Sequence, residues 1–348
     1  MKHWKALFLS GAIGVLGLPA LAQEVTTLKI GNWLPPHHLI VSKILKPWAA
    51  AIEDETGGSL QFEIMTSALG PPPAQFDLLL DRSFDVGFGV SGHNAGRFTM
   101  TQVMDLPFMS PDPWAGSAAS WLTYQKYGAE YGEHNGAHVV GLFTHSNPNI
   151  NMAKGRVETL ADLAGKTIRV GGNVTGRMMS ELGASPVQLP PTEAQTAMAR
   201  GVADGITFPS ESIAFFGITP AITSVTRIPG GLYTDTFWVA FNQDSWDSLT
   251  DEQRAAVEKH SGMAIAMLAG FAWTGEDITG EKTMRDNGVE FLTLSDEDLA
   301  TAHERLKPLE TEWVEQANSK GFPGEEILTY AREMVQNYMT DKSGFTQK

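Results

Sequence analysis

Arg169 has the clearest binding chemistry in the sequence. It lies near the end of Lys166–Val170, whose alternating β-branched residues predict a strand, and Gly171 and Gly172 follow as a loop. A guanidinium group is charged at any working pH, and its planar fork matches a carboxylate. We therefore expect Arg169 to bind an organic anion. The alternative is an arginine that lies on the surface or caps a helix.

The elements around Arg169 are strands that alternate with helices. Two helices and two further strands are predicted after the strand of Arg169, at Thr175–Leu182, Pro186–Leu189, Thr192–Arg200 and Ile206–Phe208. Such alternation is typical of a parallel sheet, whose ligand crevice lies beyond the carboxyl ends of the strands. Arg169 is therefore expected to lie at such a crevice.

The rest of the chain follows the same alternation. Trp246–Asn287 is predicted as one helix, longer than an ordinary globular helix. Further strands are predicted at Thr27–Gly31, Leu60–Met65, Phe84–Gly89, His138–His145, Ile150–Ala153, Ala221–Arg227, Tyr233–Asn242 and Val289–Thr293. Further helices are predicted at His38–Thr56, with an interruption at Pro47, and at Ala74–Arg82, Trp114–Tyr131, Asp296–Ser319 and Glu325–Met339.

These elements predict an α/β protein of two lobes with mixed or parallel sheets, and 348 residues suffice for two domains. Tyr233–Asn242 suits a strand that crosses between the lobes, and Trp246–Asn287 is expected to brace both. We expect several crossings rather than one linker. The first lobe is predicted to contain residues 23–146 and about 237–280, and the second 147–236 and about 281–348.

The first 22 residues have the features of a secretory signal peptide. Lys2 and Lys5 precede an apolar run from Ala6 to Leu18, and Ala20-Leu21-Ala22 follows. The alternative is a membrane anchor, but the run is shorter than the roughly 20 residues that span a bilayer. We expect export, cleavage after Ala22 and a mature protein in the periplasm.

Composition excludes several classes of function. The formal charge of −15, which becomes −17 once Lys2 and Lys5 are removed, argues against nucleic acid and anionic membrane surfaces as partners. The chain contains no cysteine, so thiol nucleophiles, thiolate metal sites and iron–sulfur clusters are excluded. A small anionic ligand remains compatible with this charge because one local cation can bind it.

Other residues beside the predicted crevice could contact a ligand. Trp33 follows the first strand and could stack on a ligand or pack in the core. Gln75 could donate a hydrogen bond or lie on an exposed helix, and Glu211 would need a ligand hydroxyl or amine. Phe237 and Trp238 are adjacent on a strand, so only one of them faces the crevice, and we favour Trp238.

Patterns for other chemistry are weak. Gly87–Gly92 has the form G-x-G-x-x-G, but the residues after it do not predict the helix that a dinucleotide site needs, so no cofactor is expected. His37, His38 and His93 lack the spacing of a metal site and are expected to be exposed loop residues. No G-x-S-x-G turn is present, which leaves a periplasmic hydrolase as the weaker alternative to a binding protein.

Several motifs occur in order along the chain: LKIGNWLPPHH, SALGPPPAQFDLLLDRSFDVGFGV, GKTIRVGG, LGASPVQLPPTEAQTAMARGVADG and TFPSE. With the signal peptide, they make essentially the whole mature chain resemble the dicarboxylate-type solute-binding proteins of TRAP (tripartite ATP-independent periplasmic) transporters. The resemblance implies the two-lobed periplasmic binding protein fold, with a long helix spanning both lobes and a cleft that closes over one organic anion. It also implies delivery of that anion to a membrane permease, no enzymatic activity and, we expect, a monomer.

The resemblance also assigns residues. Arg169 matches the arginine that pairs with the ligand carboxylate in this family. Phe208 occupies a position that is often asparagine, so one polar contact is replaced by a flat apolar wall. A second basic residue expected near positions 145–151 is not evident, although His145 or Asn147 could take a weaker role. These differences favour an aromatic or other flat monocarboxylate. The alternatives are a small hydroxy- or keto-acid or a dicarboxylate.

Overall fold

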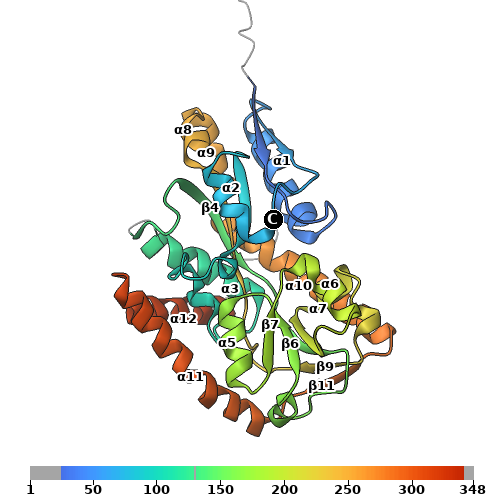
Figure 1. Ribbon diagram of the computed structural model, residues 1–348. Helices are drawn as coiled ribbons and strands as arrows, with labels where there is room; N and C mark the ends of the chain where they lie inside the picture. Colours follow the sequence, from blue (N-terminus) through green and yellow to red (C-terminus); the bar gives the residue numbers. More distant parts are fainter. Residues whose placement is uncertain (1–24, 129–130, 341–348) are drawn as a thin grey trace, which may run out of the picture.

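A computed structural model describes residues 25–128 and 131–340. The predicted signal peptide and its cleavage site lie outside the described residues. The described chain folds into two α/β lobes, each built around one sheet (Figure 1). Every strand expected from the sequence is present within three residues of its expected ends. The predicted fold class is therefore confirmed.

The first lobe is built on a five-stranded mixed sheet of order β2-β1-β3-β10-β4. Strands β1, β2 and β3 are parallel, whereas β10 is antiparallel to both β3 and β4. Aromatic and aliphatic side chains of these strands form its core, because β3 and β10 are buried along their whole length. The strand bounds are β1 Thr26–Ile30, β2 Leu60–Ile64, β3 Val86–Val90, β4 Ala137–Thr144 and β10 Thr236–Asn242.

The second lobe is built on a six-stranded sheet of order β11-β9-β5-β8-β6-β7. Only β5 runs antiparallel to both of its neighbours, β8 and β9, while the other pairs are parallel. Each sheet therefore contains one reversed strand that arrives from the other lobe. The bounds are β5 Asn149–Met152, β6 Thr167–Val170, β7 Ser185–Gln188, β8 Gly205–Phe208, β9 Ser224–Arg227 and β11 Glu290–Thr293.

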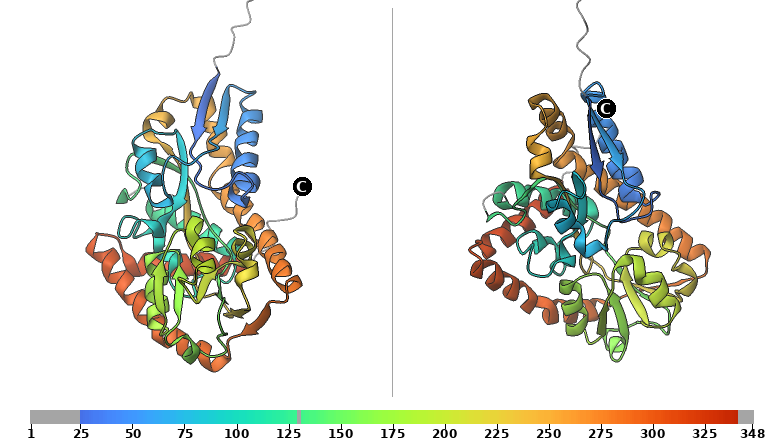
Figure 2. Two further views of the ribbon diagram at one scale, coloured as in Figure 1. Left: turned by 45° about the vertical axis from the view of Figure 1, so that its right-hand side comes forward. Right: turned by 45° about the horizontal axis from the view of Figure 1, so that its top comes forward.

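Helices cover both sheets (Figures 1 and 2). Their bounds are α1 Lys46–Glu55, α2 Gln75–Leu80, α3 Pro113–Thr123, α5 Asn173–Glu181, α6 Pro191–Ala199, α7 Ser210–Phe215, α8 Gln243–Asp247, α9 Asp251–His260, α10 Met263–Asp286, α11 Asp296–Ser319 and α12 Gly324–Thr340. Two π-helical segments, Ile40–Leu45 and Tyr124–Gly128, lie beside α1 and α3. Short 3₁₀ segments lie at Pro72–Ala74, Ser91–His93, Thr101–Asp105, Leu160–Leu163 and Thr219–Ala221.

The prediction of one continuous helix from Trp246 to Asn287 was wrong. The segment contains α8, α9 and α10, and α9 ends at His260, with Ser261 and Gly262 between it and α10. Gly262 has φ of +62°, a conformation that L side chains rarely adopt, and a Cβ there would lie 2.7 Å from Cζ2 of Trp121. The chain therefore turns at this glycine before α10 begins.

Helix α10 is the long helix that braces both lobes (Figure 1). It packs against α3 and β4 of the first lobe and against α7 of the second. Glycines allow the close approach at both contacts: a Cβ on Gly270 would lie 2.8 Å from Cα of Trp114, and one on Gly280 would lie 2.5 Å from N of Glu211. The sequence prediction missed α7, because Pro209 was expected only to end the preceding strand.

The C-terminal helices connect the lobes a second time. Helix α11 packs on α5 of the second lobe, and α12 then packs on α3 of the first (Figure 2). Residues of α12 such as Ile327 and Ala331 share a core cluster with Met104 and Ala119. Residues 281–348 were expected in the second lobe, so the contacts of α12 differ from that expectation, and the exact lobe boundaries stay a prediction.

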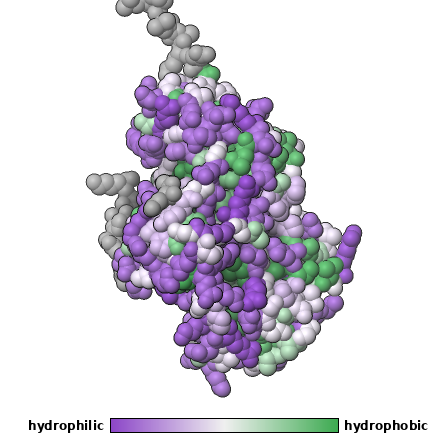
Figure 3. Space-filling model, turned by 60° about the vertical axis from the view of Figure 1, so that its left-hand side comes forward, coloured by the Kyte–Doolittle hydropathy of each residue, from purple (hydrophilic) through white to green (hydrophobic). Residues whose placement is uncertain are grey.

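The face shown in Figure 3 is mainly hydrophilic, with scattered hydrophobic side chains. Among the helices of the described residues, none is long and apolar enough to cross a membrane.

Candidate functional site

A pocket lies between the lobes, where strands of both sheets end. Its empty volume is about 470 Å³, a figure that includes space open to solvent. The lining combines aromatic rings with few polar groups. Its residues are Trp33, Leu34, His38, Ile40, Val90, His93, His145, Arg169, Gly171, Pro191, Phe208, Pro209, Ser212, Phe216, Asp235, Phe237 and Trp273.

Arg169 enters this pocket from the end of β6. Its side chain is 1% exposed, and its Nη2 donates to the carbonyl oxygen of Leu189. Its Nε and Nη1 have no hydrogen-bond partner, and no carboxylate of the described residues lies within ion-pair distance. A buried cation with unused donors costs free energy unless an anion pairs with it. Arg169 is therefore arranged to receive an anion.

Burial lowers the pKa of Arg169 to about 10, so the side chain is still a cation at neutral pH. The guanidinium carbon lies 4.4 Å from the ring centroid of Phe208. This cation–π contact orients the guanidinium plane and contributes about 0.5–2 kcal/mol. The aromatic residue at position 208 therefore supports the arginine as well as lining the pocket wall.

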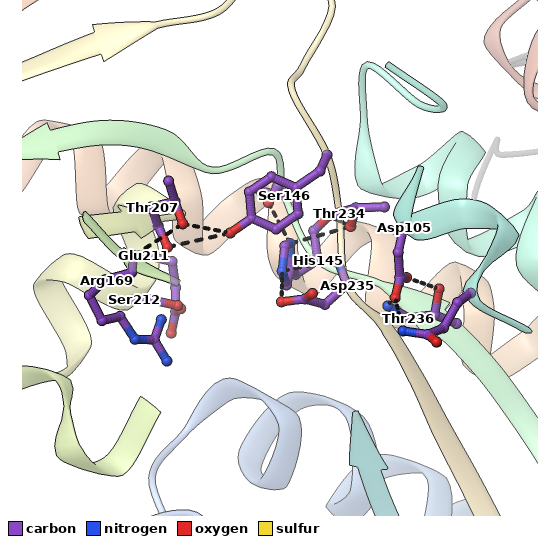
Figure 4. A network of polar contacts seen from close by, with 12 residues as sticks. Asp105, His145, Ser146, Arg169, Thr207, Glu211, Ser212, Thr234, Asp235 and Thr236 are labelled. Carbon is purple, nitrogen blue, oxygen red and sulfur yellow. Dashed lines mark hydrogen bonds and ion pairs between the residues drawn. The ribbon is translucent and has the colours of Figure 1, made fainter. Parts of the chain in front are cut away.

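A second polar group lies on the crossings between the lobes. His145 follows β4 and Asp235 precedes β10, and Figure 4 shows the Asp235 carboxylate next to the His145 ring. His145 Nε2 lies 3.1 Å from Oδ2 of Asp235, and Nδ1 lies 2.7 Å from the carbonyl oxygen of Ser146. Thr234 Oγ1 also donates to the carbonyl oxygen of His145, at 2.9 Å.

Asp235 keeps its negative charge in this arrangement. Burial alone would raise its pKa, but the hydrogen bond to His145 and the nearby Arg169 cation hold the pKa of Asp235 below its ordinary value. A second carboxyl group, Asp105, lies behind it and accepts hydrogen bonds from N and Oγ1 of Thr236, at 2.8 and 2.7 Å. Burial and the charge of Asp235 raise the pKa of Asp105 well above its usual range.

Aromatic rings form most of the remaining wall. Trp33 stacks on Phe88 with centroids 5.4 Å apart, and its Nε1 donates to the carbonyl oxygen of Phe88 at 3.0 Å. Phe237 and Trp273 lie 6.2 Å apart, centroid to centroid, and Phe208 lies 5.9 Å from Phe216. These rings are held by their neighbours, so the pocket offers a preformed apolar surface.

Three predicted site residues do not line the pocket. Trp238 points to the other face of the sheet, where it packs 5.2 Å from the ring of Phe76, so Phe237 faces the pocket instead of Trp238. Gln75 is buried, and its amide donates to the carbonyl oxygens of Gly70 and Pro71. The Gln75 amide therefore stabilises the loop that precedes its own helix. Trp33, His145, Arg169 and Phe208, in contrast, are brought together by the fold.

Glu211 lies behind the pocket wall on α7. It is 4% exposed and accepts a hydrogen bond from Oγ of Ser212 at 2.8 Å, while its backbone N donates to Asp277 of α10 at 3.1 Å. Burial raises the pKa of Glu211 to about 8, and burial likewise raises the pKa of Asp277 to about 6. The backbone of Glu211 therefore contacts α10, and its carboxylate Oε1 lies 4.0 Å from Nε2 of the pocket residue His38.

The chain was compared with known proteins. Residues 30–317 match the family described as bacterial extracellular solute-binding protein, family 7. The chain belongs to this family. A similar curated protein, the outer membrane transporter protein TsaT of Comamonas testosteroni, is 27% identical over 335 residues, which cover 95% of this chain and 98% of TsaT.

Solved structures of TRAP solute-binding proteins have the same fold. A periplasmic protein from Bordetella bronchiseptica, with bound (R)- and (S)-mandelate, has a TM-score of 0.86 and 32% identity over 90% of this chain and 99% of its own. A protein from Rhodoferax ferrireducens T118, in complex with copurified benzoate, also has a TM-score of 0.86, with 26% identity over 91% of this chain and 99% of its own. The resemblance to TRAP solute-binding proteins is thus confirmed.

For a family 7 solute-binding protein, the sequence prediction missed several pocket residues. His38 and His93 were expected on exposed loops, but His38 is 2% exposed and His93 is half-buried. Burial lowers the pKa of His38 to about 3 and that of His93 to about 4, so both imidazoles are neutral at neutral pH. Asp235 and Trp273 were also missed. The only available signal was the position of Asp235 within the predicted crossing strand Tyr233–Asn242.

The groups that line this family 7 pocket are suited to binding an organic anion. Among the described residues, no group of three or more His, Asp or Glu side chains could hold a metal ion. Two glycines of the G-x-G-x-x-G pattern serve packing, since a Cβ on Gly87 would lie 2.6 Å from Cε2 of Phe84 and one on Gly89 would lie 2.5 Å from Cζ2 of Trp238. One permanent cation, one carboxylate and aromatic walls can hold a flat organic anion and fix its orientation.

Proposed function

We propose that this protein is the solute receptor for aromatic monocarboxylates of a TRAP transporter. Arg169 pairs with the carboxylate, and Trp33, Phe208, Phe237 and Trp273 enclose the ring. The observation that carries the proposal is the buried guanidinium with unpartnered Nε and Nη1, set among aromatic walls. Pairing such a cation with an anion in a desolvated site is strongly favourable.

The charges of the pocket support a monocarboxylate over a dicarboxylate. Among its lining residues, all of them in the described part of the chain, Arg169 is the only permanently charged cation. His38 and His93 are neutral at neutral pH, and Asp235 is negative. A second ligand carboxylate would therefore find no second permanent cation in the lining and would be repelled by Asp235. The similar structures with mandelate and benzoate, and a marine metagenome protein with 3-hydroxybenzoate at 28% identity, support the same ligand class.

The cellular setting follows from the same proposal. The protein is exported, its signal peptide is cleaved after Ala22, and it acts as a monomer that releases its ligand to the TRAP membrane permease. The charged start and apolar run of residues 1–22 support export, and membership in an extracellular solute-binding family supports the periplasm.

Thermal-shift screening of the purified protein tests the function. We expect aromatic monocarboxylates to raise Tm more than keto-acids, sugar acids or C4 dicarboxylates at equal concentration, because ligands that bind only the folded state stabilise it. Chromatography of the mixtures should return each ligand unchanged. Consumption of a stabilising compound would instead support a hydrolase, and stabilisation by dicarboxylates alone would refute the aromatic assignment.

A further inference from the structure

We propose that Asp235 is a specificity residue that selects aromatic acids with a hydroxyl group on the carbon next to the carboxylate. The inference rests on the proposed function, because it assumes that Arg169 binds the ligand carboxylate. It names a narrower ligand class, 2-hydroxy aromatic acids such as mandelate, and a residue that no sequence pattern singled out.

The first support is the position of the Asp235 carboxylate. Oδ2 of Asp235 lies 3.4 Å, and Nη1 of Arg169 lies 4.0 Å, from the point that a Cβ on Gly171 would occupy. Both groups thus border the same small space beside Gly171, yet they form no ion pair within 4.0 Å. A ligand can therefore enter between them. The hydroxyl of a 2-hydroxy acid is attached to the atom next to the carboxylate carbon, so one ligand can reach both groups.

The second support is the chemistry of an ionised carboxylate. It can only accept hydrogen bonds. Asp235 is 16% exposed at the pocket wall and is held in place by His145 Nε2 at 3.1 Å. Asp235 and a neighbouring ligand carboxylate are both negative and repel each other. Asp235 therefore disfavours an acid that has no hydrogen-bond donor for it. A ligand hydroxyl that donates to Asp235 converts this repulsion into a charge-assisted hydrogen bond.

The Arg169 cation favours ligands with a hydroxyl group over ligands with an amine. An ammonium group could also donate to Asp235, but it would lie beside the Arg169 cation and would have to lose its water among aromatic rings. The ring hydroxyl of 3-hydroxyphenylacetate lies far from its carboxylate and cannot reach Asp235 while the carboxylate is paired with Arg169. The position of the donor on the ligand is therefore decisive.

Calorimetric titration of the ligand-free protein tests the proposal with four probes: mandelate, phenylacetate, 3-hydroxyphenylacetate and phenylglycine. Mandelate and phenylacetate differ by one hydroxyl, and 3-hydroxyphenylacetate is an isomer of mandelate. We expect mandelate to bind about 10- to 100-fold more tightly than either phenylacetate or 3-hydroxyphenylacetate, as for one hydrogen bond to a charged group. Dissociation constants within threefold of one another, or tighter binding of phenylglycine than of mandelate, would overturn the inference. Failure of all these acids to bind would overturn the proposed function with it.

Two variants assign the effect to Asp235. Asp235→Asn should weaken mandelate binding and strengthen phenylacetate binding, so that their ratio falls at least tenfold, because the acceptor is weakened and the repulsion removed. Asp105→Asn is the matched control: it changes a neighbouring buried acid that does not line the pocket, and it should leave the ratio within twofold. Equal loss of affinity for mandelate, phenylacetate and 3-hydroxyphenylacetate in Asp235→Asn, with an unchanged ratio, contradicts a role in specificity. If either variant fails to fold, the comparison of ligand affinities for the wild-type protein still tests the proposal.

Discussion

At the residue scale, the pocket is defined by the buried charge of Arg169 and by the hydrogen-bond partners that this side chain lacks. The guanidinium is fully buried, its Nε and Nη1 lack partners, and Phe208 lies against its face. A free energy cost remains in the ligand-free protein because these donors have lost their water. An incoming carboxylate removes that cost, so much of the binding free energy is expected at this one contact.

Arg169→Ala tests this expectation. Loss of a partner from a buried, hydrogen-bonded charge pair costs roughly 2–5 kcal/mol, so the affinity for an aromatic acid should fall by roughly 30- to several-thousand-fold. Arg177→Ala is the matched control, because Arg177 is exposed on α5 and pairs with Glu312 at 3.1 Å. Calorimetry should give the control a wild-type affinity. A wild-type affinity in Arg169→Ala as well would refute the assignment of the carboxylate site.

Phe237 and Trp238 are neighbours with different expected roles. Phe237 lines the pocket, so Phe237→Leu should weaken aromatic-acid binding by roughly 2- to 10-fold, as for loss of an aromatic pair. Trp238 is buried on the opposite face against Phe76, so Trp238→Phe should lower the free energy of unfolding by roughly 1–3 kcal/mol and leave affinity unchanged. Denaturant unfolding and calorimetry on both variants measure the contrast. The opposite pattern would mean that Trp238 faces the ligand.

At the element scale, the contact between α10 and α7 joins the C-terminal half of the long helix to the second lobe. It depends on a close backbone approach, because the space for a side chain at Gly280 is filled by Ser210 and Glu211. The N-terminal half of α10 is held in the same way against Trp114 by Gly270. Small residues at these two positions therefore allow one helix to pack tightly on both lobes.

Gly280→Ala should destabilise the protein. Overpacking of a tight contact costs roughly 1–3 kcal/mol, and we expect the free energy of unfolding to fall by that amount. Gly275→Ala provides the control on the same helix, since a Cβ there meets no atom within 4 Å. That variant should be stabilised by roughly 0.5–1 kcal/mol, because alanine favours a helix interior over glycine. Equal effects of the two substitutions in denaturant unfolding would contradict the close α10–α7 contact.

At the scale of the whole molecule, buried acids make stability depend on pH. Glu211 and Asp277, whose pKa values are raised to about 8 and about 6, lie together between α7 and α10. The folded state retains their protons over a range in which the unfolded state has lost them. Stability from these groups is fully present below about pH 4 and is lost as the pH rises toward 8.

Glu211→Gln should reduce this loss. The amide cannot ionise, so the variant should gain roughly 3–5 kcal/mol of unfolding free energy over the wild type at pH 8 and little at pH 4.5. Denaturant unfolding at several pH values measures the difference. Glu312→Gln, which removes an exposed carboxylate paired with Arg177, should follow the wild-type curve. A gain that is the same at every pH would show that Glu211 does not titrate in this range.

The local pattern of the sequence determined the alternation of strands and helices, the two lobes and the position of Arg169 at a strand end, because periodicity and turn residues act over a few neighbouring residues. Only the tertiary structure decided which side chains meet. His145 and Asp235 are 90 residues apart, and they form one polar group because two crossings between the lobes bring them together. Three other features also depend on the tertiary structure. They are the helix break at Gly262, which packs against Trp121, the contact of Glu211 with α10, and the position of Phe237 rather than Trp238 in the pocket. Each depends on packing between distant segments, which a local pattern does not record.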